Sequence, residues 1–511
     1  MFQSILGKKK FEYIELEEPE CFRDLNLRQL TRTIMAERPG YDLTPYFYEM
    51  NIDKEDIIYR HEVMRDLEHE AVYKAVTDFS VCMCQLQKYL EYYETVPFDV
   101  QKNCWLLNAA SLYGEGLLTL QQALAGAELQ SEGMKEFLSY LSERVASNDF
   151  MDMLAKSREI KQKLQEIRFT LDVKKDKIFI LPTVDESCYT QSIQQFFLKN
   201  EGLDNEAERA ENSGMMIPLL LDGKLELTEL EQSIIKRIEE KNAAVFKQLQ
   251  DFKLITPDFV PAAIKEYHNE VQFYLAFLRF RNDMRRFGFS FTYPEFSEEP
   301  PCIKGFYDLA LAYKNAYEGT AVIVNDAHYR EKELFFVVTG PNQGGKTTFA
   351  RALGQIVYFS KIGLPVAGEF CRLPLFAGIM THFEMEESMM SGEGKLKEEL
   401  GRLKPMLEKT DTKQFVIINE LFTTAATYDA TIMGKRVLEH FVKDCCYGIY
   451  VTHIAELAEE TGQVVSLVAG VDQASGARTF QIRRKKAEGN GYATALVEKY
   501  RLSYHDLMER L

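Results

Sequence analysis

The sequence predicts a mainly helical N-terminal region followed by an α/β domain. Two observations separate these regions along the 511-residue chain. Glycine and proline are sparse before residue 290, and long segments there repeat apolar residues at intervals of three and four, as amphipathic helices do. After residue 301, short apolar runs alternate with helical patterns, which is typical of a domain with a mainly parallel sheet.

The N-terminal region contains three long helical patterns, at residues 57–92, 135–167 and 227–252. Between the second and the third, Arg168 to Leu181 places two β-branched and aromatic runs on either side of a charged turn, which predicts a β-hairpin. The segment Glu201 to Gly214 is rich in Glu, Asn and Gly, and we expect a loop there.

The C-terminal region contains short runs typical of buried strands at 335–339, 415–418 and 448–452. A stretch with prolines, Tyr293 to Pro301, separates them from the helical region and is interpreted as an interdomain linker.

The composition excludes some classes of protein. The formal net charge of −17 argues against a surface covered with nucleic-acid contacts, although a local basic groove stays possible. No uncharged apolar stretch reaches the length of a membrane-spanning helix, and the first residues do not resemble a signal peptide, so we expect a cytoplasmic protein without membrane contact. The scattered cysteines indicate neither a disulfide framework nor a zinc site.

A glycine-rich motif follows the first of these strands and opens a helical run, which is the context that a phosphate-binding P-loop requires. Its backbone N–H groups would surround the phosphates of ATP at the start of a helix. Lys346 would reach the β- and γ-phosphates, and the Thr347 hydroxyl would bind Mg²⁺. The predicted nucleotide-binding residues are Gly340, Pro341, Asn342, Gln343, Gly344, Gly345, Lys346, Thr347 and Thr348. The alternative is a glycine-rich turn without a ligand.

A polar pair, Asn419 and Glu420, ends the second buried strand, where a Walker B element usually lies. In that element an acidic residue commonly assists the metal and a Glu polarises the attacking water. Asn419 stands at the metal-assisting position without a charge, and Glu420 is the candidate catalytic base. The alternative is a strand end with incidental polar residues.

The order of these elements resembles that of the MutS family of mismatch-repair ATPases. Residues 339–348 are close to that family's TGPNMGGKST, and residues 324–326, 362–367 and 427–429 resemble further segments of its ATPase domain. The resemblance implies an ABC-type P-loop NTPase domain with ATP and Mg²⁺ as cofactors. It also implies that His453, after Thr452 at the end of the third strand, senses the γ-phosphate.

Applied to the whole chain, the resemblance implies a helical core with an ascending lever helix at residues 1–165 and a clamp-like hairpin and loop at 166–225. A descending helix and the return to the helical core would follow at 226–300, and the ATPase domain at 301–511. We expect the mismatch-recognition and connector domains of MutS to be absent.

The chain also departs from the family. The turn that usually accompanies the nucleotide is replaced by residues 422–426, and the signature segment by residues 391–395. In ABC-type ATPases a signature loop binds the nucleotide of the partner subunit, so the resemblance implies a homodimer with composite ATP sites. Ser391 is the candidate for this contact, and the alternative is a solvated loop before a helix.

Three functions stay open at this point. The first, favoured by the resemblance, is a dimeric DNA-binding ATPase that acts as a clamp or switch in repair or recombination without recognising mismatches. The second is an ATPase that acts on ribosomes or structured RNA. The third, which the acidic composition favours, is an ATP-gated protein-interaction switch. Three basic clusters could contact nucleic acid: Lys174, Lys175 and Lys177; Arg279, Arg281, Arg285 and Arg286; and Arg483, Arg484, Lys485 and Lys486.

Overall fold

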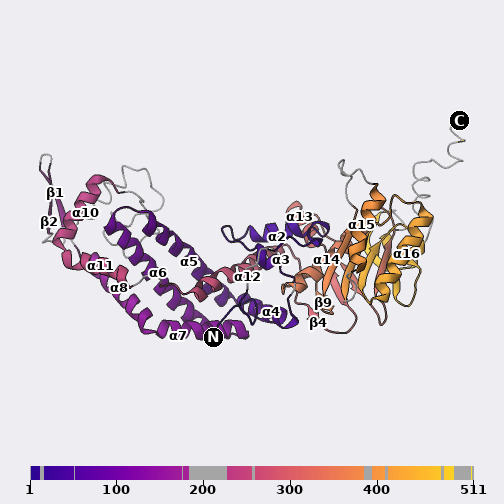
Figure 1. The fold of residues 1–511 in the computed structure, drawn as a ribbon, viewed down its shortest axis with the longest axis horizontal. Helices are drawn as coiled ribbons and strands as arrows, with labels where there is room; N and C mark the ends of the chain where they lie inside the picture. The colour runs from indigo at the N-terminus through magenta and orange to yellow at the C-terminus, as the bar shows by residue number, and fades with distance from the viewer. Residues whose placement is uncertain are drawn as a thin grey trace. The chain divides into compact units, whose positions relative to one another are not determined.

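The computed structural model describes residues 2–11, 16–50, 52–167, 169–174, 177–182, 227–255, 259–384, 394–408, 413–472, 477–487 and 508. It divides into two compact units, drawn in Figure 1. Unit 1 comprises residues 1–3 and 66–268, and unit 2 comprises 4–65 and 269–511.

Unit 1 is a bundle of helices that pack around α6. Trp105, Leu107 and Tyr113 of this helix are each at most 3% exposed. The neighbours α5, α7, α8 and α11 all contact it. The helices of this unit are α5 (Glu70–Thr95), α6 (Asp99–Ala125), α7 (Glu132–Ala146), α8 (Asn148–Glu166), α10 (Glu229–Lys241) and α11 (Ala243–Ile255).

Each of the three long helical patterns forms two helices rather than one. The pattern at 57–92 divides between α4 (Lys54–Glu68) and α5, at His69, whose backbone is extended. The pattern at 135–167 divides at Ser147, also extended, and the pattern at 227–252 divides at Asn242. Ser and Asn side chains compete with the helical backbone for hydrogen bonds, which explains two of these breaks.

The predicted hairpin is confirmed. Strands β1 (Phe169–Lys174) and β2 (Lys177–Pro182) pair antiparallel, with Leu171 opposite Ile180. The predicted loop at 201–214 lies outside the described residues. A role of the hairpin as a clamp tip stays a prediction.

Unit 2 contains a six-stranded sheet in the order β10-β11-β12-β7-β13-β14. The five strands from β10 to β13 are parallel, and β14 pairs antiparallel with β13 at one edge. The strands are β7 (Phe335–Thr339), β10 (Gly378–Phe383), β11 (Gln414–Asn419), β12 (Tyr447–Val451), β13 (Val464–Val471) and β14 (Arg478–Arg484). The prediction of a helical N-terminal region followed by an α/β domain is therefore confirmed.

Helices cover this sheet on two faces (Figure 1). Helix α14 (Lys346–Lys361) lies on one face, where a Cβ placed at Gly354 would lie 2.6 Å from Ile417 of β11. Helices α15 (Lys395–Glu408) and α16 (Thr427–Lys443) pack on the alternating residues of the other face, which include Val416 and Ile418. Alternation of side chains along a strand explains this division.

Two smaller sheets adjoin the large one. Strands β4 (Glu295–Phe296), β9 (Phe370–Leu373), β5 (Cys302–Phe306) and β6 (Asn325–His328) form one, and β3 (Phe291–Thr292) pairs with β8 (Val366–Ala367) in the other. The stretch Tyr293 to Pro301, expected to be an interdomain linker, lies inside unit 2 because its β4 pairs with β9.

The segment 4–65 belongs to unit 2 because its backbone binds α14 directly. Arg351 Nε donates to Asp24 O at 2.9 Å, Gln355 Nε2 donates to Leu25 O at 2.9 Å, and Tyr358 Oη donates to Phe47 O at 2.6 Å. The two compact units are divided at other residues than 165, 225 and 300, and the predicted domain bounds stay predictions. The remaining helices are α1 (Cys21–Asp24), α2 (Leu27–Met35), α3 (Thr44–Tyr48), α12 (Ala262–Arg286) and α13 (Leu309–Glu318).

Among the described residues, no helix is both long enough and apolar enough to cross a membrane.

Candidate functional site

The predicted site residues follow three neighbouring parallel strands. In the sheet, β12 lies between β11 and β7. The glycine-rich loop follows β7, Glu420 follows β11, and His453 follows β12 by two residues. Because the carboxyl ends of parallel strands meet at one edge, three segments far apart in the sequence converge there. This edge of an open α/β sheet is where ligands bind.

The glycine-rich loop needs its glycines for backbone conformation and for close packing. Gly340 and Gly345 have φ values of 124° and 90°, in the left-handed range that side chains disfavour. A Cβ at Gly340 would lie 2.9 Å from Ala469 Cβ of β13, and one at Gly344 would lie 2.9 Å from Pro341 O. The loop is thereby held against β13, and it leads directly into the first turn of α14.

Lys346 begins α14 and is buried, with an exposed fraction of 4%. Its Nζ donates to Gly340 O at 2.9 Å and to Pro341 O at 3.2 Å. Burial lowers the pKa of Lys346, and the nearby charge of Glu420 opposes this lowering. A cation held by neutral carbonyl oxygens at a helix N-terminus provides strong electrostatic attraction for an anion.

Thr347 and Asn419 connect the loop to the end of β11. Thr347 Oγ1 donates to Asn419 Oδ1 over 2.9 Å, and Asn419 is 9% exposed. This bond brings together the two residues that the sequence predicted as metal ligands. Both present an uncharged oxygen, which is the type of ligand that Mg²⁺ accepts.

Glu420 and His453 form a hydrogen-bonded pair across the ends of β11 and β12. His453 Nε2 lies 2.9 Å from Glu420 Oε1, and the two side chains are 45% and 24% exposed. The hydrogen bond with His453 is the largest cause that lowers the pKa of Glu420, and burial works in the opposite direction. Glu420 has a φ of 56° and donates its N–H to Val451 O of β12 at 2.9 Å. This backbone geometry turns the carboxylate away from the line of β11.

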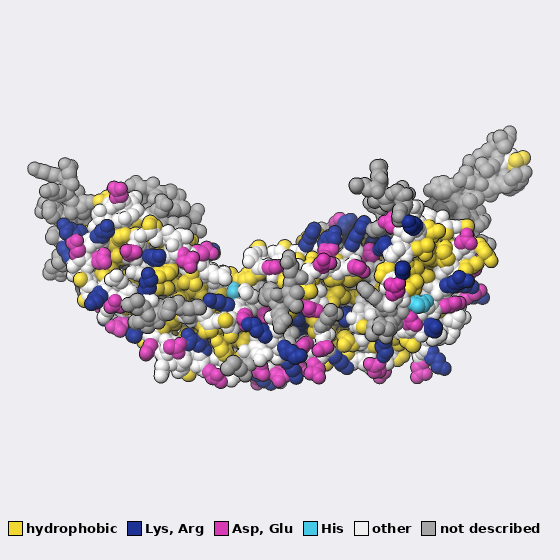
Figure 2. All heavy atoms as spheres, viewed as in Figure 1, with side chains coloured by type: hydrophobic (Ala, Val, Ile, Leu, Met, Phe, Trp, Pro, Cys, Tyr) yellow, Lys and Arg dark blue, Asp and Glu magenta, His cyan; other side chains and the backbone are white. Residues whose placement is uncertain are grey.

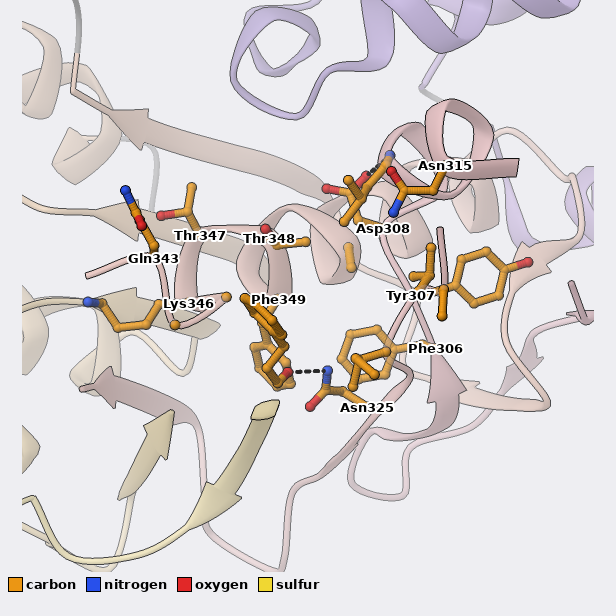
Figure 3. A pocket seen from close by; sticks show the side chains of 18 of the residues that line it. Phe306, Tyr307, Asp308, Asn315, Asn325, Gln343, Lys346, Thr347, Thr348 and Phe349 are labelled. Atoms are coloured by element: carbon orange, nitrogen blue, oxygen red, sulfur yellow. Dashed lines mark hydrogen bonds between the residues drawn. The ribbon is translucent and has the colours of Figure 1, made fainter. Parts of the chain in front are cut away.

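A cavity of about 490 Å³ opens beside these residues. Figure 3 shows Gln343, Lys346 and Thr347 on one side of it and Tyr307, Asp308 and Asn315 on the other. The loop lines the cavity from Asn342 to Thr348, and Glu420 contributes to the same wall. The far end is partly apolar, with Phe306, Leu311, Val322 and Ile323. A polar end beside an apolar end suits a ligand that carries phosphates on a ring system.

Phe480 and Asn325 shape the mouth of the cavity, and sequence reasoning gave neither of them a role in the site. Asn325 Nδ2 donates to Phe480 O over 3.2 Å, shown as a dashed line in Figure 3, and Ile482 N donates to Asn325 Oδ1 at 2.8 Å. Phe480 has a φ of 55° and is 46% exposed. Asn325 lies in a segment noted for its family resemblance, whereas Phe480 is an ordinary aromatic residue of an edge strand.

Ser391 lies outside the described residues, as do its neighbours up to residue 393. The contact predicted for it with a partner subunit therefore stays a prediction. The other predicted residues lie together: the glycine-rich loop, Thr347 with Asn419, and Glu420 with His453.

The oxygens available for a cation at this edge include those of Thr347 and Asn419. Within the described ranges, no group of three or more His, Cys, Asp or Glu side chains is placed to hold a metal ion. Thr347 and Asn419 provide two oxygens 2.9 Å apart. That arrangement fits Mg²⁺ in its usual setting, where phosphate oxygens and water complete the coordination.

The comparison with known families agrees with this geometry. The family model described as MutS domain V matches residues 336–492, which include the loop, Glu420 and His453. Residues 336–492 are therefore similar to MutS domain V. The match begins at the second residue of β7 and includes the rest of β7 and the whole of α14, β11 and β12.

Individual relatives support the same relationship. The DNA mismatch repair protein MutS of Streptococcus uberis is 25% identical over 300 residues, 57% of this chain and 32% of that protein. The protein of the same name from Fervidobacterium nodosum is 23% identical over 244 residues, 46% of this chain and 28% of that protein. The MutS protein of Thermotoga maritima is 28% identical over 172 residues, which are 34% of this chain and 21% of that protein. The chain thus spans about a third or less of the length of these relatives.

Proposed function

We propose that the C-terminal domain is a P-loop NTPase of the ABC and MutS type that binds ATP with Mg²⁺ and hydrolyses it. The observation that carries the proposal is the convergence of the glycine-rich loop, the Thr347–Asn419 bond and the Glu420–His453 pair at one sheet edge. The adjoining cavity of about 490 Å³ has the volume of a small-ligand site.

The residues divide the chemistry of hydrolysis between them. Lys346 and the N–H groups of the loop would neutralise the charge of the phosphate chain and orient it. Thr347 and Asn419 would hold Mg²⁺, which supplies further neutralisation of the phosphates when bound. Glu420, whose pKa is lowered chiefly by the hydrogen bond with His453 and which therefore stays ionised to lower pH, would accept a hydrogen bond from the attacking water. His453 would hold the Glu420 carboxylate in place and could contact the terminal phosphate from the adjacent strand.

Nucleotide binding is tested most simply at Lys346. Lys346→Ala should weaken the binding of ATP by about a hundredfold or more, because a buried cation that pairs with phosphate is removed. Titration calorimetry of the full chain with ATP and Mg²⁺ measures this, and Lys435→Ala, an exposed lysine paired with Glu459, is the matched control. Equal affinity of Lys346→Ala and the parent would refute the assignment.

The proposal extends to a homodimer. The composite sites implied by the MutS resemblance require a second chain, with Ser391 as the predicted contact to the partner's nucleotide. Sedimentation of the parent and of Ser391→Arg with and without ATP tests this. We expect the parent to dimerise with ATP and Ser391→Arg to stay monomeric while it still binds ATP. Dimerisation of both to the same extent would remove Ser391 from the interface.

We further propose that this dimer binds DNA and acts on it as a clamp or switch without mismatch recognition. The support is the name of the relatives, which are DNA mismatch repair proteins. The basic clusters offer less support, because Arg281 is 2% exposed, Arg279 pairs with Glu37 and Arg484 pairs with Glu333. On the face shown in Figure 2, positive and negative side chains are largely interspersed.

The partner is tested by measuring ATP turnover with duplex DNA, mismatched duplex DNA, branched DNA and ribosomes at one salt concentration. DNA should stimulate turnover, with equal effects of perfect and mismatched duplexes. Stimulation by ribosomes alone would identify an RNA partner instead, and no response to any of them would favour a protein-interaction switch. A mismatch preference of about tenfold, or 1.4 kcal/mol, would contradict the absence of mismatch recognition.

A further inference from the structure

Arg478 is the first residue of β14, the edge strand of the large sheet, and it contacts the glycine-rich loop. Glu420 follows β11, on the other side of β7 in the sheet. Arg478 Nη1 donates to Gln343 Oε1 over 2.9 Å. Gln343 has a φ of 58° and lines the cavity. The loop therefore has two cations beside it, Lys346 and Arg478, and both belong to the same chain.

The backbone around Arg478 is fixed against the loop. Asn325 accepts a hydrogen bond from Ile482 N and donates one to Phe480 O, which anchors β14 two residues beyond Arg478. A Cβ built at Gly345 would lie 3.5 Å from Phe480 Cδ1, so the strand passes close to the loop at this glycine. The backbone of Arg478 is thus held beside the loop by a strand, and its guanidinium reaches the loop through the bond to Gln343.

The electrostatics at this point favour an anion. Arg478 is exposed, and among the described residues its hydrogen-bond partner is a neutral amide, with no carboxylate in salt-bridge distance. Burial is the main cause of the lowered pKa of Lys346, and the charge of Arg478 adds to it. Two cations that repel each other beside one loop would both be stabilised by a negative charge between them.

We propose that Arg478 binds the phosphate chain of the nucleotide together with Lys346, and that Gln343 holds its guanidinium over the loop. The inference rests on the proposed nucleotide binding. The planar guanidinium with several N–H donors suits two phosphate oxygens at once, as a lysine at this position would not. Arg478 would then be a further binding residue supplied by the same chain.

The test compares the affinity of four variants for ATPγS in the presence of Mg²⁺, with thermal unfolding as a check on folding. Arg478→Ala should lose about tenfold or more, the effect of one charge-assisted contact, and Arg478→Lys should lose less. Gln343→Ala should lose only a small part of this, because it removes the support and leaves the cation. Arg483→Ala is the matched control from the same strand, exposed and bonded to Gln481, and should bind as the parent does.

The outcomes separate the inference from the proposed function. Parent-like affinity of Arg478→Ala would overturn the inference while leaving Lys346 and the nucleotide site intact. An equal loss in Gln343→Ala and Arg478→Ala would also overturn it, because the arginine would then act only by shaping the loop. If Arg483→Ala lost as much affinity for ATPγS as Arg478→Ala, the loss would be explained by general surface charge and not by a specific contact, which would overturn the inference. A parent that binds no ATPγS would refute both proposals.

Discussion

Asp66 in unit 1 and Asn419 in unit 2 are both buried polar side chains, at 1% and 9% exposure. Asp66 accepts hydrogen bonds from Gln130 N at 2.9 Å, Ser131 N at 2.9 Å and Ser131 Oγ at 2.6 Å. Its bonding capacity is used locally, at the start of α7. Asn419 instead accepts from Thr347, and both Thr347 and Glu420, the residue after Asn419, line a cavity.

The difference shows how to distinguish a structural polar group from a functional one in this molecule. A buried carboxylate whose partners are backbone N–H groups and a hydroxyl at the start of another helix stabilises the fold. A group of polar residues that converges from three strand ends, with Lys346, Thr347 and Glu420 lining a cavity, can instead bind a ligand there. Substitutions in the two places should therefore change different measured quantities.

The largest effect is expected at Glu420. Glu420→Gln removes the acceptor for the proton of the attacking water and should lower ATP turnover by about a hundredfold or more while ATP binding persists. Turnover is measured by phosphate release, with Glu459→Gln, in an exposed ion pair, as control. If Glu420→Gln hydrolysed ATP at the parent rate, the catalytic base would be another residue. The distinction between a functional group at Glu420 and a structural one at Asp66 would then fail.

The next effect is expected at Asp66 and concerns stability alone. Asp66→Ala leaves two buried donors of Ser131 and the part-buried Gln130 N without their acceptor. It should lower the free energy of unfolding of unit 1 by about 2–3 kcal/mol. Trp105, the only tryptophan of the chain, lies in α6 of unit 1, so its fluorescence in urea reports on this unit. Affinity for ATP should stay unchanged; a large loss of affinity would mean that the two polar groups do not differ as we argue.

The smallest effect is a shift in the pH dependence of turnover in His453→Ala. The hydrogen bond with His453 lowers the pKa of Glu420, so its removal leaves burial to raise that pKa. The acidic limb of turnover should then move to higher pH, because Glu420 is protonated earlier as the pH falls. The lowered pKa of Glu420 also contributes to the free energy of unfolding. This contribution is present above the pKa of Glu420 in the unfolded state and is lost as the pH falls through its pKa in the folded state. It should be smaller in His453→Ala.

His440→Ala is the matched control for this measurement. His440 is 40% exposed and lies 3.4 Å from Asp444, so it resembles His453 in exposure and in its carboxylate partner. Its removal should leave the acidic limb in place. An unchanged limb in His453→Ala, or a shift to lower pH, would show that the histidine does not control the ionisation of Glu420.

The sequence predicted the elements of unit 2 that have local patterns. The strands at 335–339, 415–418 and 448–452 were found to within one residue at each end, because runs of apolar residues bounded by polar ones mark buried parallel strands. The convergence of the loop, Asn419 and Glu420 followed from the rule that parallel strands end at one edge. The bond of Thr347 with Asn419 could not be foreseen, since it depends on side-chain geometry.

Other features depend on contacts between distant segments, which no local pattern reveals. The packing of residues 4–65 on α14 rests on backbone carbonyls such as Asp24 O and Leu25 O, and a carbonyl has no sequence signature. Phe480 and Arg478 reach the loop only because β14 returns antiparallel beside β13. The helix breaks at His69 and Ser147 were missed because the apolar periodicity continues on both sides of them.

The most direct test of the account is phosphate release from ATP by the purified parent protein, measured beside Lys346→Ala in the same buffer with Mg²⁺. We predict steady release by the parent and none above background by Lys346→Ala, whose urea unfolding should match that of the parent. Equal release by both proteins, or no release by a parent that binds ATP, would contradict the claim that this sheet edge is an ATP-hydrolysing site.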